Sequence, residues 1–296
     1  MPESDPELDL TVVVPAHDAA ATIAEQLDAL AEQEWSGSFE VVVVDNRSSD
    51  ATAGVVAEYA ARDPRFRLVS APERNSIGYA RNTGIAAARG RSIAMCDSDD
   101  VVGPGWVAAI GDALASHAFV TGPLDVHRLN PPEVVETRGL AIEHGPGSFL
   151  DAFPFAHSCN LAFHRALVDT HGGFDESLVN GSDVELSHRF WRNGVELTYV
   201  PDAVVAYRYR ATTRGLYRQA RNYARVKPVL VARFRSEGTA LPSPFSWRRW
   251  VWLARNVLLV RTAAGRARWV WVLGGCVGEV QGMWRVRRAR RRGRGS

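Results

Sequence analysis

Short apolar runs alternate with segments of helical periodicity over the first 116 residues of the chain. Strands are predicted over residues 11–15, 39–44, 66–70 and 92–96; the first is a β-branched run, and the first two are predicted to be buried. Helices are predicted over residues 19–34, 51–61, 78–88 and 106–116. This alternation predicts βαβ units and a mostly parallel α/β sheet. In such sheets, ligands bind beyond the carboxyl ends of the strands.

The pattern becomes irregular after residue 120. Residues 122–154 are rich in Gly and Pro and predict a loop-rich or antiparallel segment that covers a site. Further helices are predicted over residues 160–170 and 184–193, and a strand over 196–200. We expect a flexible N-terminus (1–9), an α/β domain (10–210), a helical Arg/Trp-rich region (211–284) and a disordered basic tail (285–296).

The formal net charge of +2 conceals two oppositely charged parts. Residues 1–204 carry a net charge of −18, whereas residues 205–296 carry +20 and contain only two acidic residues, Glu237 and Glu279. A basic segment of this kind favours an anionic partner, such as nucleic acid, anionic lipid or the acidic body of the protein itself.

Cysteine usage and hydropathy bear on the compartment. The three cysteines, at positions 96, 159 and 276, lack metal-site spacing, and their odd count cannot form a disulfide framework, which favours a reducing compartment. The N-terminus lacks the apolar core of a signal peptide. No uninterrupted apolar run reaches 18 residues, so we expect no spanning helix. We therefore expect a cytoplasmic protein, with a peripheral position on the inner face of the plasma membrane as an additional expectation.

An acidic cluster, residues 97–100 (DSDD), follows the fourth predicted strand and precedes Gly103. Carboxylates at the end of a strand can share one hard cation, and Mg²⁺ or Mn²⁺ takes oxygen ligands. Such a cation bridges phosphates and neutralises the charge that develops on a departing diphosphate. The alternative interpretation is a solvated acidic turn, because Asp is common in turns.

Five motifs occur in order along the chain: VVVPAHDAA, VVVVDNRSSDAT, ERNSIGYARNTGIAAARG, SIAMCDSDD and GGFDESLVNGSDVELSHRFWRNG. Together they resemble the family 2 glycosyltransferases of the GT-A fold, over roughly residues 10–210. The resemblance implies a GT-A domain, which is Rossmann-like with a mostly parallel sheet flanked by helices, here followed by a basic amphipathic helical region. It also implies a bacterial, metal-dependent enzyme of the hexosyltransferase kind.

The resemblance assigns the donor side residue by residue. The residues that it implies for binding a nucleotide-sugar are Pro15, Ala16, His17, Asp18, Asp45, Asn75, Gly78, Arg81, Asp97 and Ser98. Asp45 would accept a hydrogen bond from a ring N–H of the base, often uracil. Arg81 would pair with phosphate, the alternative being an exposed helix arginine of little energetic effect. Asp97 and Asp99 would bind Mn²⁺ or Mg²⁺.

The acceptor side maps to the later motifs. The resemblance implies acceptor-side roles for Asn160, Gly173, Phe174 and Ser182. Asp183 would act as the general base, and its alternative role is the N-cap of the following helix, a role compatible with the first.

Three positions depart from the family pattern. Asn46 stands where a second Asp is usual, and Ser182 replaces a Glu beside the catalytic Asp. Many members of the family carry a His just after the late strand. In this chain Tyr207 follows that strand, and no His lies beyond His188. Asp100 is predicted either to support the metal ligands or to cap the following turn.

The predicted activity is inverting transfer of a sugar from a nucleotide-diphosphate sugar, a UDP-sugar foremost, to a hydroxyl of a cell-envelope, polysaccharide or lipid-linked glycan acceptor. The alternative is a catalytically silent member that binds a nucleotide-sugar or a glycan. A dinucleotide-dependent enzyme is disfavoured, because residues 15–20 contain no Gly for a phosphate-binding loop.

The basic region holds six of the nine tryptophans. Polar residues at near-heptad spacing over 245–266 predict one amphipathic helix with a Trp, Val and Leu face. Two interpretations stay open for residues 245–296: binding to an anionic membrane surface, and a helical subdomain packed on the body. Nucleic acid is an unlikely partner, because the body is acidic.

Overall fold

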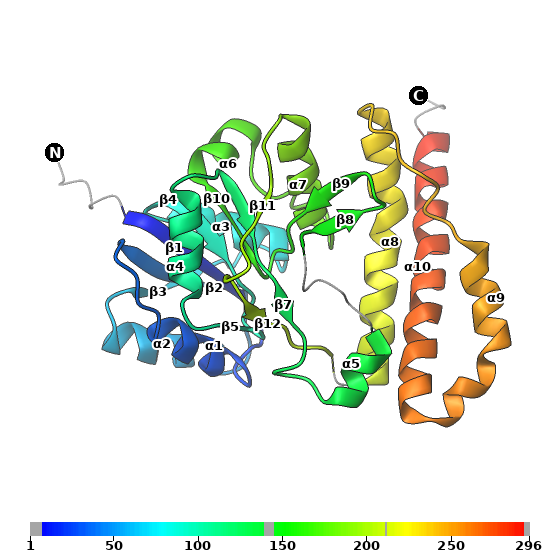
Figure 1. Cartoon of the computed structure of the whole chain (residues 1–296), viewed down its shortest axis with the longest axis horizontal. Coiled ribbons are helices and arrows are strands. Elements are labelled where there is room, and N and C mark those ends of the chain that lie inside the picture. Colours follow the sequence, from blue (N-terminus) through cyan, green and yellow to red (C-terminus); the bar gives the residue numbers. More distant parts are fainter. Residues whose placement is uncertain (1–7, 139–144, 211, 293–296) are drawn as a thin grey trace. The chain divides into compact units, whose positions relative to one another are not determined.

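The computed structural model describes residues 8–138, 145–210 and 212–292, and the chain divides into two compact units (Figure 1). The sheet unit comprises residues 8–128, 145–149 and 153–208 of the described chain. The helical unit comprises residues 129–138, 150–152, 209–210 and 212–292.

A seven-stranded sheet organises the sheet unit. In spatial order its strands are β11 (Thr198–Tyr199), β6 (Phe119–Thr121), β10 (Leu161–His164), β4 (Gly90–Met95), β1 (Leu8–Ala16), β2 (Phe39–Asp45) and β3 (Phe66–Ser70). Neighbours among β4, β1, β2 and β3 pair in parallel, whereas β10 is antiparallel to both β4 and β6. The predicted parallel α/β sheet is therefore confirmed, and β1, β2 and β4 end at one edge.

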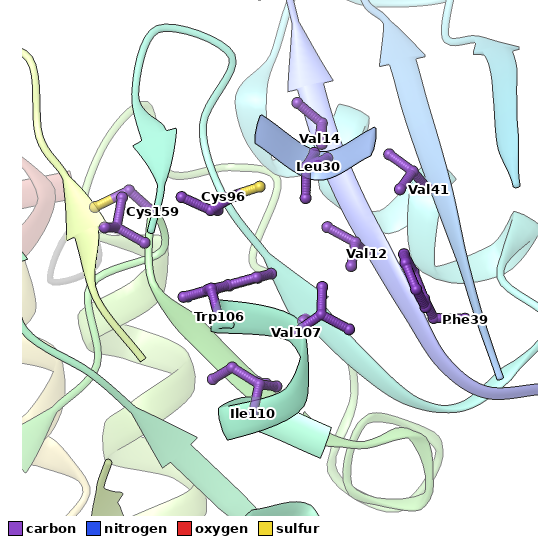
Figure 2. Close-up of a cluster of buried hydrophobic side chains, with 14 of the residues drawn as sticks. Val12, Val14, Leu30, Phe39, Val41, Cys96, Trp106, Val107, Ile110 and Cys159 are labelled. Atoms are coloured by element: carbon purple, nitrogen blue, oxygen red, sulfur yellow. The ribbon is translucent and has the colours of Figure 1, made fainter. Parts of the chain in front are cut away.

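Helices cover both faces of this sheet. Val12 and Val14 of β1 point to one apolar cluster and Val13 to the other, as alternation along a strand requires. The first cluster includes α1 (Ile23–Ala31), α2 (Thr52–Arg62) and α4 (Trp106–Leu114), and Figure 2 shows its side chains. The second cluster includes α3 (Ile77–Ala87), α6 (Arg165–His171) and α7 (Ser182–Arg192).

The irregular segment after residue 120 contributes short elements. A small sheet joins β5 (Val101–Val102), β12 (Val205–Ala206) and β7 (Leu124–Asp125). An antiparallel pair joins β8 (Gly147–Phe149) to β9 (Phe153–Phe155), in agreement with the antiparallel alternative predicted for residues 122–154.

The helix predicted over residues 160–170 is wrong in its first half. Leu161–His164 forms β10, and the helix α6 begins only at Arg165. The cause is tertiary, because this apolar segment pairs with strands on both sides, at Ile93 of β4 and Phe119 of β6. Local periodicity cannot separate a short buried strand from a short buried helix.

The helical unit contains α5 (Pro132–Arg138), α8 (Thr213–Ser236), α9 (Trp247–Arg255), the 3₁₀ helix η1 (Val257–Arg261) and α10 (Ala263–Arg292). The helices α8 and α10 run side by side in the same direction (Figure 1). Over the described parts of the chain, no helix combines the length and the apolar content that crossing a membrane would need.

The single amphipathic helix predicted over residues 245–266 is divided in the structure. Asn256 ends α9 and donates from its side-chain amide to the Trp252 carbonyl, 2.9 Å away. Thr262 is extended, and its hydroxyl accepts from the Gly265 backbone N–H at the start of α10. Both polar residues therefore act on helix ends, where their side chains compete for backbone groups, rather than forming part of a stripe.

The basic tail expected to be disordered from residue 285 is helical as far as Arg292, within α10. Residues 293–296 of this tail and residues 1–7 of the expected flexible N-terminus lie outside the described residues, so the predictions for them stay predictions.

Glycines allow α10 to approach α8 closely. A Cβ added at Gly278 would lie 2.3 Å from the Arg221 carbonyl oxygen of α8, and Gly274 and Gly282 meet the α8 carbonyls of Tyr217 and Arg225 in the same way. Gly54 on α2 offers a contrast, because a Cβ there would meet nothing within 4 Å.

We predict that Gly278→Ala lowers the free energy of unfolding by about 1–3 kcal/mol through overpacking. The matched substitution Gly54→Ala gains the same helix propensity without overpacking, so it should raise the free energy of unfolding by up to about 1 kcal/mol. Urea unfolding of the full chain measures both. A Gly278→Ala protein as stable as the parent would contradict this description of the α8–α10 contact.

Candidate functional site

The acidic loop 97–100 follows the carboxyl end of β4 and is hydrogen-bonded to residues at the start of α1. Gln26 donates to the Asp97 carbonyl over 3.1 Å, and the Thr22 hydroxyl lies 3.2 Å from the Ser98 carbonyl. Asp100 is 1% exposed, and one of its carboxylate oxygens accepts from the Arg208 backbone N–H at 2.8 Å. The other oxygen is buried and has no hydrogen-bond partner among the described residues. The loop is therefore a structured, largely buried turn and not a solvated one.

Burial and mutual repulsion shape the protonation of this loop. Burial raises the pKa of Asp100 well above its usual value, and the neighbouring Asp99 and Asp97 raise it further. Burial also raises the pKa of Asp97, against the opposing effect of Arg81. A bound cation would offset both the repulsion and the cost of burying these charges.

Three side chains in this region could surround a cation. The ligand atoms of Asp97, Asp100 and Cys159 lie within 4.8 Å of one another. Burial raises the pKa of the Cys159 thiol far above its usual value, so the thiol stays protonated and the two carboxylates are the better ligands. The orphaned Asp100 oxygen fits this interpretation. Asp99, predicted as a ligand, is not part of this group, and its role stays a prediction.

Arg81, from the helix α3, extends into the same region. It is 6% exposed, which excludes the alternative of an exposed helix arginine. One terminal nitrogen donates to the Ser158 hydroxyl at 2.6 Å and lies 3.5 Å from an Asp97 oxygen, while the other lies 3.4 Å from the Ser182 hydroxyl. Arg81 thus links the end of β4 to the start of α7.

Asp183 lies in the first turn of α7. One of its carboxylate oxygens accepts from the Ser158 backbone N–H at 3.3 Å, and the other from the Val184 N–H at 2.9 Å. The N-cap position belongs to Gly181, at a φ of +75°, so the N-cap alternative for Asp183 is wrong. The negative charge of Asp183 contributes to the raised pKa of Asp97, so the two carboxylates repel each other across the site.

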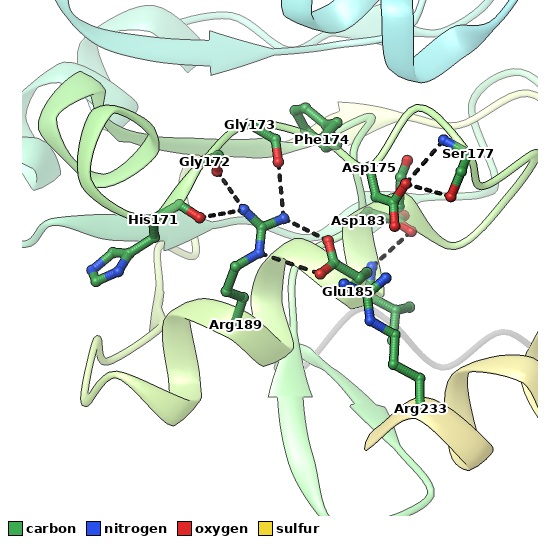
Figure 3. Close-up of polar contacts among 12 residues, drawn as sticks. His171, Gly172, Gly173, Phe174, Asp175, Ser177, Asp183, Glu185, Arg189 and Arg233 are labelled. Atoms are coloured by element: carbon green, nitrogen blue, oxygen red, sulfur yellow. Dashed lines mark hydrogen bonds and ion pairs between the residues drawn. The ribbon is translucent and has the colours of Figure 1, made fainter. Parts of the chain in front are cut away.

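The loop 172–176 is held by two side chains from different helices. Arg189, paired with Glu185, donates to the backbone carbonyls of His171, Gly172 and Gly173 (Figure 3). On the other side, the Asn82 amide bonds both to the backbone N–H and to the carbonyl of Phe174.

Close packing explains two glycines that the sequence placed among binding residues. A Cβ at Gly173 would lie 2.5 Å from the Asn82 side-chain oxygen. A Cβ at Gly78 would lie 3.2 Å from the Glu176 Cα, so Gly78 lets α3 approach this loop. Both glycines therefore serve the contact between α3 and the loop.

On the donor side, His17 bridges two strand ends. Its Nδ1 lies 2.8 Å from the Asn46 carbonyl oxygen, and its Nε2 lies 3.1 Å from the Asn75 amide nitrogen. Asp18 adopts a φ of +48° and accepts from the Ser49 backbone N–H at 2.7 Å. Pro15 and Ala16 end β1, and the Asp45 carboxylate at the end of β2 accepts from the Ser48 N–H. The predicted donor residues thus meet at adjacent strand ends.

Asn46, a departure from the family pattern, has a structural explanation. Its amide nitrogen donates to the carbonyls of Ala71 (2.8 Å) and Arg74 (2.7 Å), and its oxygen accepts from the Ser76 backbone N–H. An ionised Asp could not donate these two bonds. Asn46 thus connects the ends of β2 and β3 to the start of α3, beside His17.

Three of the residues predicted for the acceptor side are buried, and their acceptor roles stay predictions. Asn160 is fully buried; its side chain accepts from Trp106 and donates to the carbonyls of Pro123 and Ala203, so it connects core segments and faces no surface. The ring of Phe174 is 3% exposed and lies 5.3 Å from the Arg81 guanidinium. Ser182 is also buried, at 1% exposure, where it accepts from Arg81.

The segment between β9 and β10 supplies residues that sequence reasoning missed. Ser158 contacts both Arg81 and Asp183, and Cys159 lies beside Asp97 and Asp100. None of the five sequence motifs covers Ser158 or Cys159, and the antiparallel pairing of β10 with β4 places them next to the end of β4.

A cavity of about 750 Å³ lies at the opposite end of the strands, lined by Asp9, Trp35, Arg91 and Asp112 among others. None of the predicted site residues lines it, so it is separate from the acidic loop.

A mostly parallel sheet with a buried acidic loop, an arginine and a helix-borne carboxylate at its strand ends is consistent with the GT-A glycosyltransferase fold. The family model "Glycosyl transferase family 2" matches residues 11–172, and "Glycosyl transferase family group 2" matches residues 92–280. The chain therefore belongs to glycosyl transferase family 2.

Curated relatives agree with this assignment. The chain is 48% identical over 103 residues to the succinoglycan biosynthesis protein ExoO of Rhizobium meliloti, covering 35% of this chain and 29% of that protein. It is 24% identical over 198 residues to the glycosyltransferase AglE of Haloferax volcanii, covering 66% and 65% of the two proteins. The chain thus spans less than two thirds of the length of these relatives.

Solved structures share the fold. The mannosyltransferase PcManGT of Pyrobaculum calidifontis, in complex with GDP-Man and Mn²⁺, aligns with a TM-score of 0.66 and 21% identity over 94% of this chain and 88% of that one. S. aureus TarS 1-349, in complex with UDP, aligns with a TM-score of 0.52 and 19% identity over 92% and 90%.

We predict that Asn46→Asp lowers the free energy of unfolding by about 1–3 kcal/mol, because two backbone carbonyls lose their donor. Thermal or urea unfolding measures the change. Asn75→Asp is the matched control at an exposed neighbour, and it should stay close to the parent. Equal stability of the Asn46→Asp protein and the parent would contradict the bridging role.

Proposed function

We propose that the protein is an inverting glycosyltransferase that moves a sugar from a nucleotide-diphosphate sugar to an acceptor hydroxyl. The observation that carries this proposal is the convergence of Asp97, Asp100, Arg81 and Asp183 at the carboxyl ends of the strands. This constellation supplies what sugar transfer needs, namely stabilisation of a leaving diphosphate and a base for the incoming hydroxyl.

The nucleoside would lie against the ends of β1 and β2. There the backbone at Pro15 and Ala16, the His17–Asn75 pair and the Asp45 carboxylate form one side of the proposed donor site. A carboxylate at position 45 can accept from the N–H of uracil, which favours a UDP-sugar. The fold neighbours were solved with GDP-Man and with UDP, so the proposed preference for uracil rests on Asp45.

Asp97 and Asp100 are the residues proposed to hold Mn²⁺ or Mg²⁺, with Asp99 beside them. When bound, the cation would neutralise charge on the diphosphate leaving group. Arg81, held against Asp97 and Ser158, keeps a fixed positive charge at the same place. Because its two terminal nitrogens already contact protein oxygens, and only its buried Nε lacks a hydrogen-bond partner among the described residues, we propose that Arg81 acts mainly by orienting Asp97 and by its charge.

Asp183 is the proposed general base. Backbone N–H groups of Ser158 and Val184 fix its carboxylate, which would take the proton of the acceptor hydroxyl as that oxygen bonds to the anomeric carbon. The bond from this carbon to the diphosphate oxygen breaks on the opposite face, so the configuration inverts.

The acceptor is proposed to be a growing glycan, polysaccharide or lipid-linked saccharide of the cell envelope. The support is the similarity to a succinoglycan biosynthesis protein over 103 residues. Ser182 departs from the Glu of the family pattern and accepts a hydrogen bond from Arg81, which favours a second candidate: a member that binds the donor without turning it over.

We predict that Asp183→Asn lowers kcat by roughly 10²–10⁴-fold while donor binding changes little, because the proton loses its acceptor. Initial rates of nucleotide release and calorimetric donor binding measure the two effects. Asp175→Asn, in the neighbouring loop, is the matched control and should retain most of the turnover. Near-normal turnover by Asp183→Asn would remove Asp183 as the base. Tight donor binding by a parent chain that turns over no donor would support the silent candidate.

We predict that Asp97→Asn and Asp100→Asn each weaken Mn²⁺ binding by about tenfold or more, because each removes a charged oxygen ligand. Titration calorimetry of the full chain with Mn²⁺ measures the loss, and chelation by EDTA should abolish turnover by the parent. Asp169→Asn, an exposed acid on α6, serves as the control. Unchanged Mn²⁺ affinity in both variants would exclude this group, and a loss confined to Asp99→Asn would move the site to that residue.

A further inference from the structure

The segment formed by α9 and η1 exposes large apolar side chains to solvent. The exposed fractions are 63% for Trp247, 38% for Trp250, 50% for Val257 and 63% for Leu258. Arg248, Arg255 and Arg261 are exposed along the same segment. We call these seven residues the α9–η1 surface. Large apolar groups in one exposed stretch, flanked by charged residues, mark interaction sites.

The segment is firmly held from its inner side. Leu253 is buried, its carbonyl accepts from the Trp269 indole N–H at 3.0 Å, and the Arg268 guanidinium lies 5.5 Å from the Trp252 ring. Figure 1 shows α10 between α8 and α9 within the helical unit. The exposed tryptophans therefore belong to a segment whose opposite face packs against α10.

An ion pair on the inner side of α9 involves the one acidic residue of this region. Residues 245–296 contain thirteen arginines and a single acidic residue, Glu279. Glu279 is 1% exposed and lies 2.6 Å from the Arg249 guanidinium, which in turn covers Gly275. The exposed charges from residue 245 to the end of α10 are consequently all positive, and a partner that matches them is anionic.

The residue types on this surface select among anionic partners. Trp and Arg together suit the boundary between lipid headgroups and acyl chains, where an indole has one apolar and one polar side. Val257 and Leu258 add aliphatic area whose transfer from water into acyl chains is favourable. Aliphatic side chains cannot stack on nucleic-acid bases as aromatic side chains do. Charge and apolar content together fit an anionic bilayer better than a nucleic acid.

We propose that the α9–η1 surface docks on an anionic lipid bilayer. Trp247, Trp250 and Leu258 enter the headgroup–acyl boundary, and Arg248, Arg255 and Arg261 contact lipid phosphates. The docking does not depend on the transferase reaction, so either can fail without the other.

The test is co-sedimentation of the full chain with vesicles of pure phosphatidylcholine and of phosphatidylcholine with 30% phosphatidylglycerol. We expect binding to the anionic vesicles, weakening with added salt because charges are screened, and a blue shift of tryptophan emission. Binding to the anionic vesicles that equals binding to the neutral ones, or no binding to either, would overturn the proposal.

Two variants separate the apolar from the electrostatic contribution. Trp247→Ser with Leu258→Ser should weaken partitioning by about tenfold or more through lost apolar insertion. Arg248→Glu with Arg255→Glu should weaken it by about fivefold or more for each arginine. Both pairs change exposed side chains, and circular dichroism checks that the chain is folded.

The control variants are Leu68→Ser and Arg62→Glu, an exposed leucine on β3 and an exposed arginine on α2 in the sheet unit. They should bind vesicles like the parent. Equal losses in the control and surface variants would contradict the assignment. So would surface variants that turn a dimer into a monomer without changing vesicle binding, since the surface would then face a second copy of the chain. Release by competing RNA together with unchanged binding of the serine variant would point to nucleic acid instead.

Discussion

Like-charged carboxylates that share a buried space repel each other, and the site in the sheet unit depends on how this repulsion is contained. Asp97 and Asp100 lie in a buried turn. Burial disfavours their ionised forms and therefore raises the pKa of each carboxyl. Arg81 contains part of the repulsion by lying against Asp97. A divalent cation would contain the rest, which is why an arrangement costly in the free protein suits a metal and a diphosphate.

The surrounding residues hold these charged side chains in fixed positions relative to one another. Gln26 fixes the acidic loop from α1, Ser158 connects Arg81 to Asp183, and Asn46 joins two strand ends beside His17. Each makes bonds to groups from different elements, so a site assembled from distant segments keeps one geometry. Preorganisation of this kind lets fixed charges stabilise a transition state without rearranging first.

The sheet and most of the donor side could be predicted from the sequence, because apolar runs and the strand-end motifs are local signals. Residues 161–164 could not, since their strand conformation depends on pairing with β4 and β6. The same pairing buries Asn160 and brings Ser158 to Arg81, so one wrongly predicted element explains why neither placement follows from the sequence. Asn256 and Thr262 were interpreted as part of a polar stripe because periodicity does not distinguish a surface residue from a helix cap.

The central claim is that the strand ends around Asp97 form one site for a nucleotide-sugar and a divalent cation. Calorimetric titration of the full chain with UDP-sugars and GDP-sugars, each with and without Mn²⁺, tests it most directly. The account predicts saturable binding of a UDP-sugar that tightens when Mn²⁺ is present. Absence of binding by every nucleotide-sugar, with and without Mn²⁺, would contradict it.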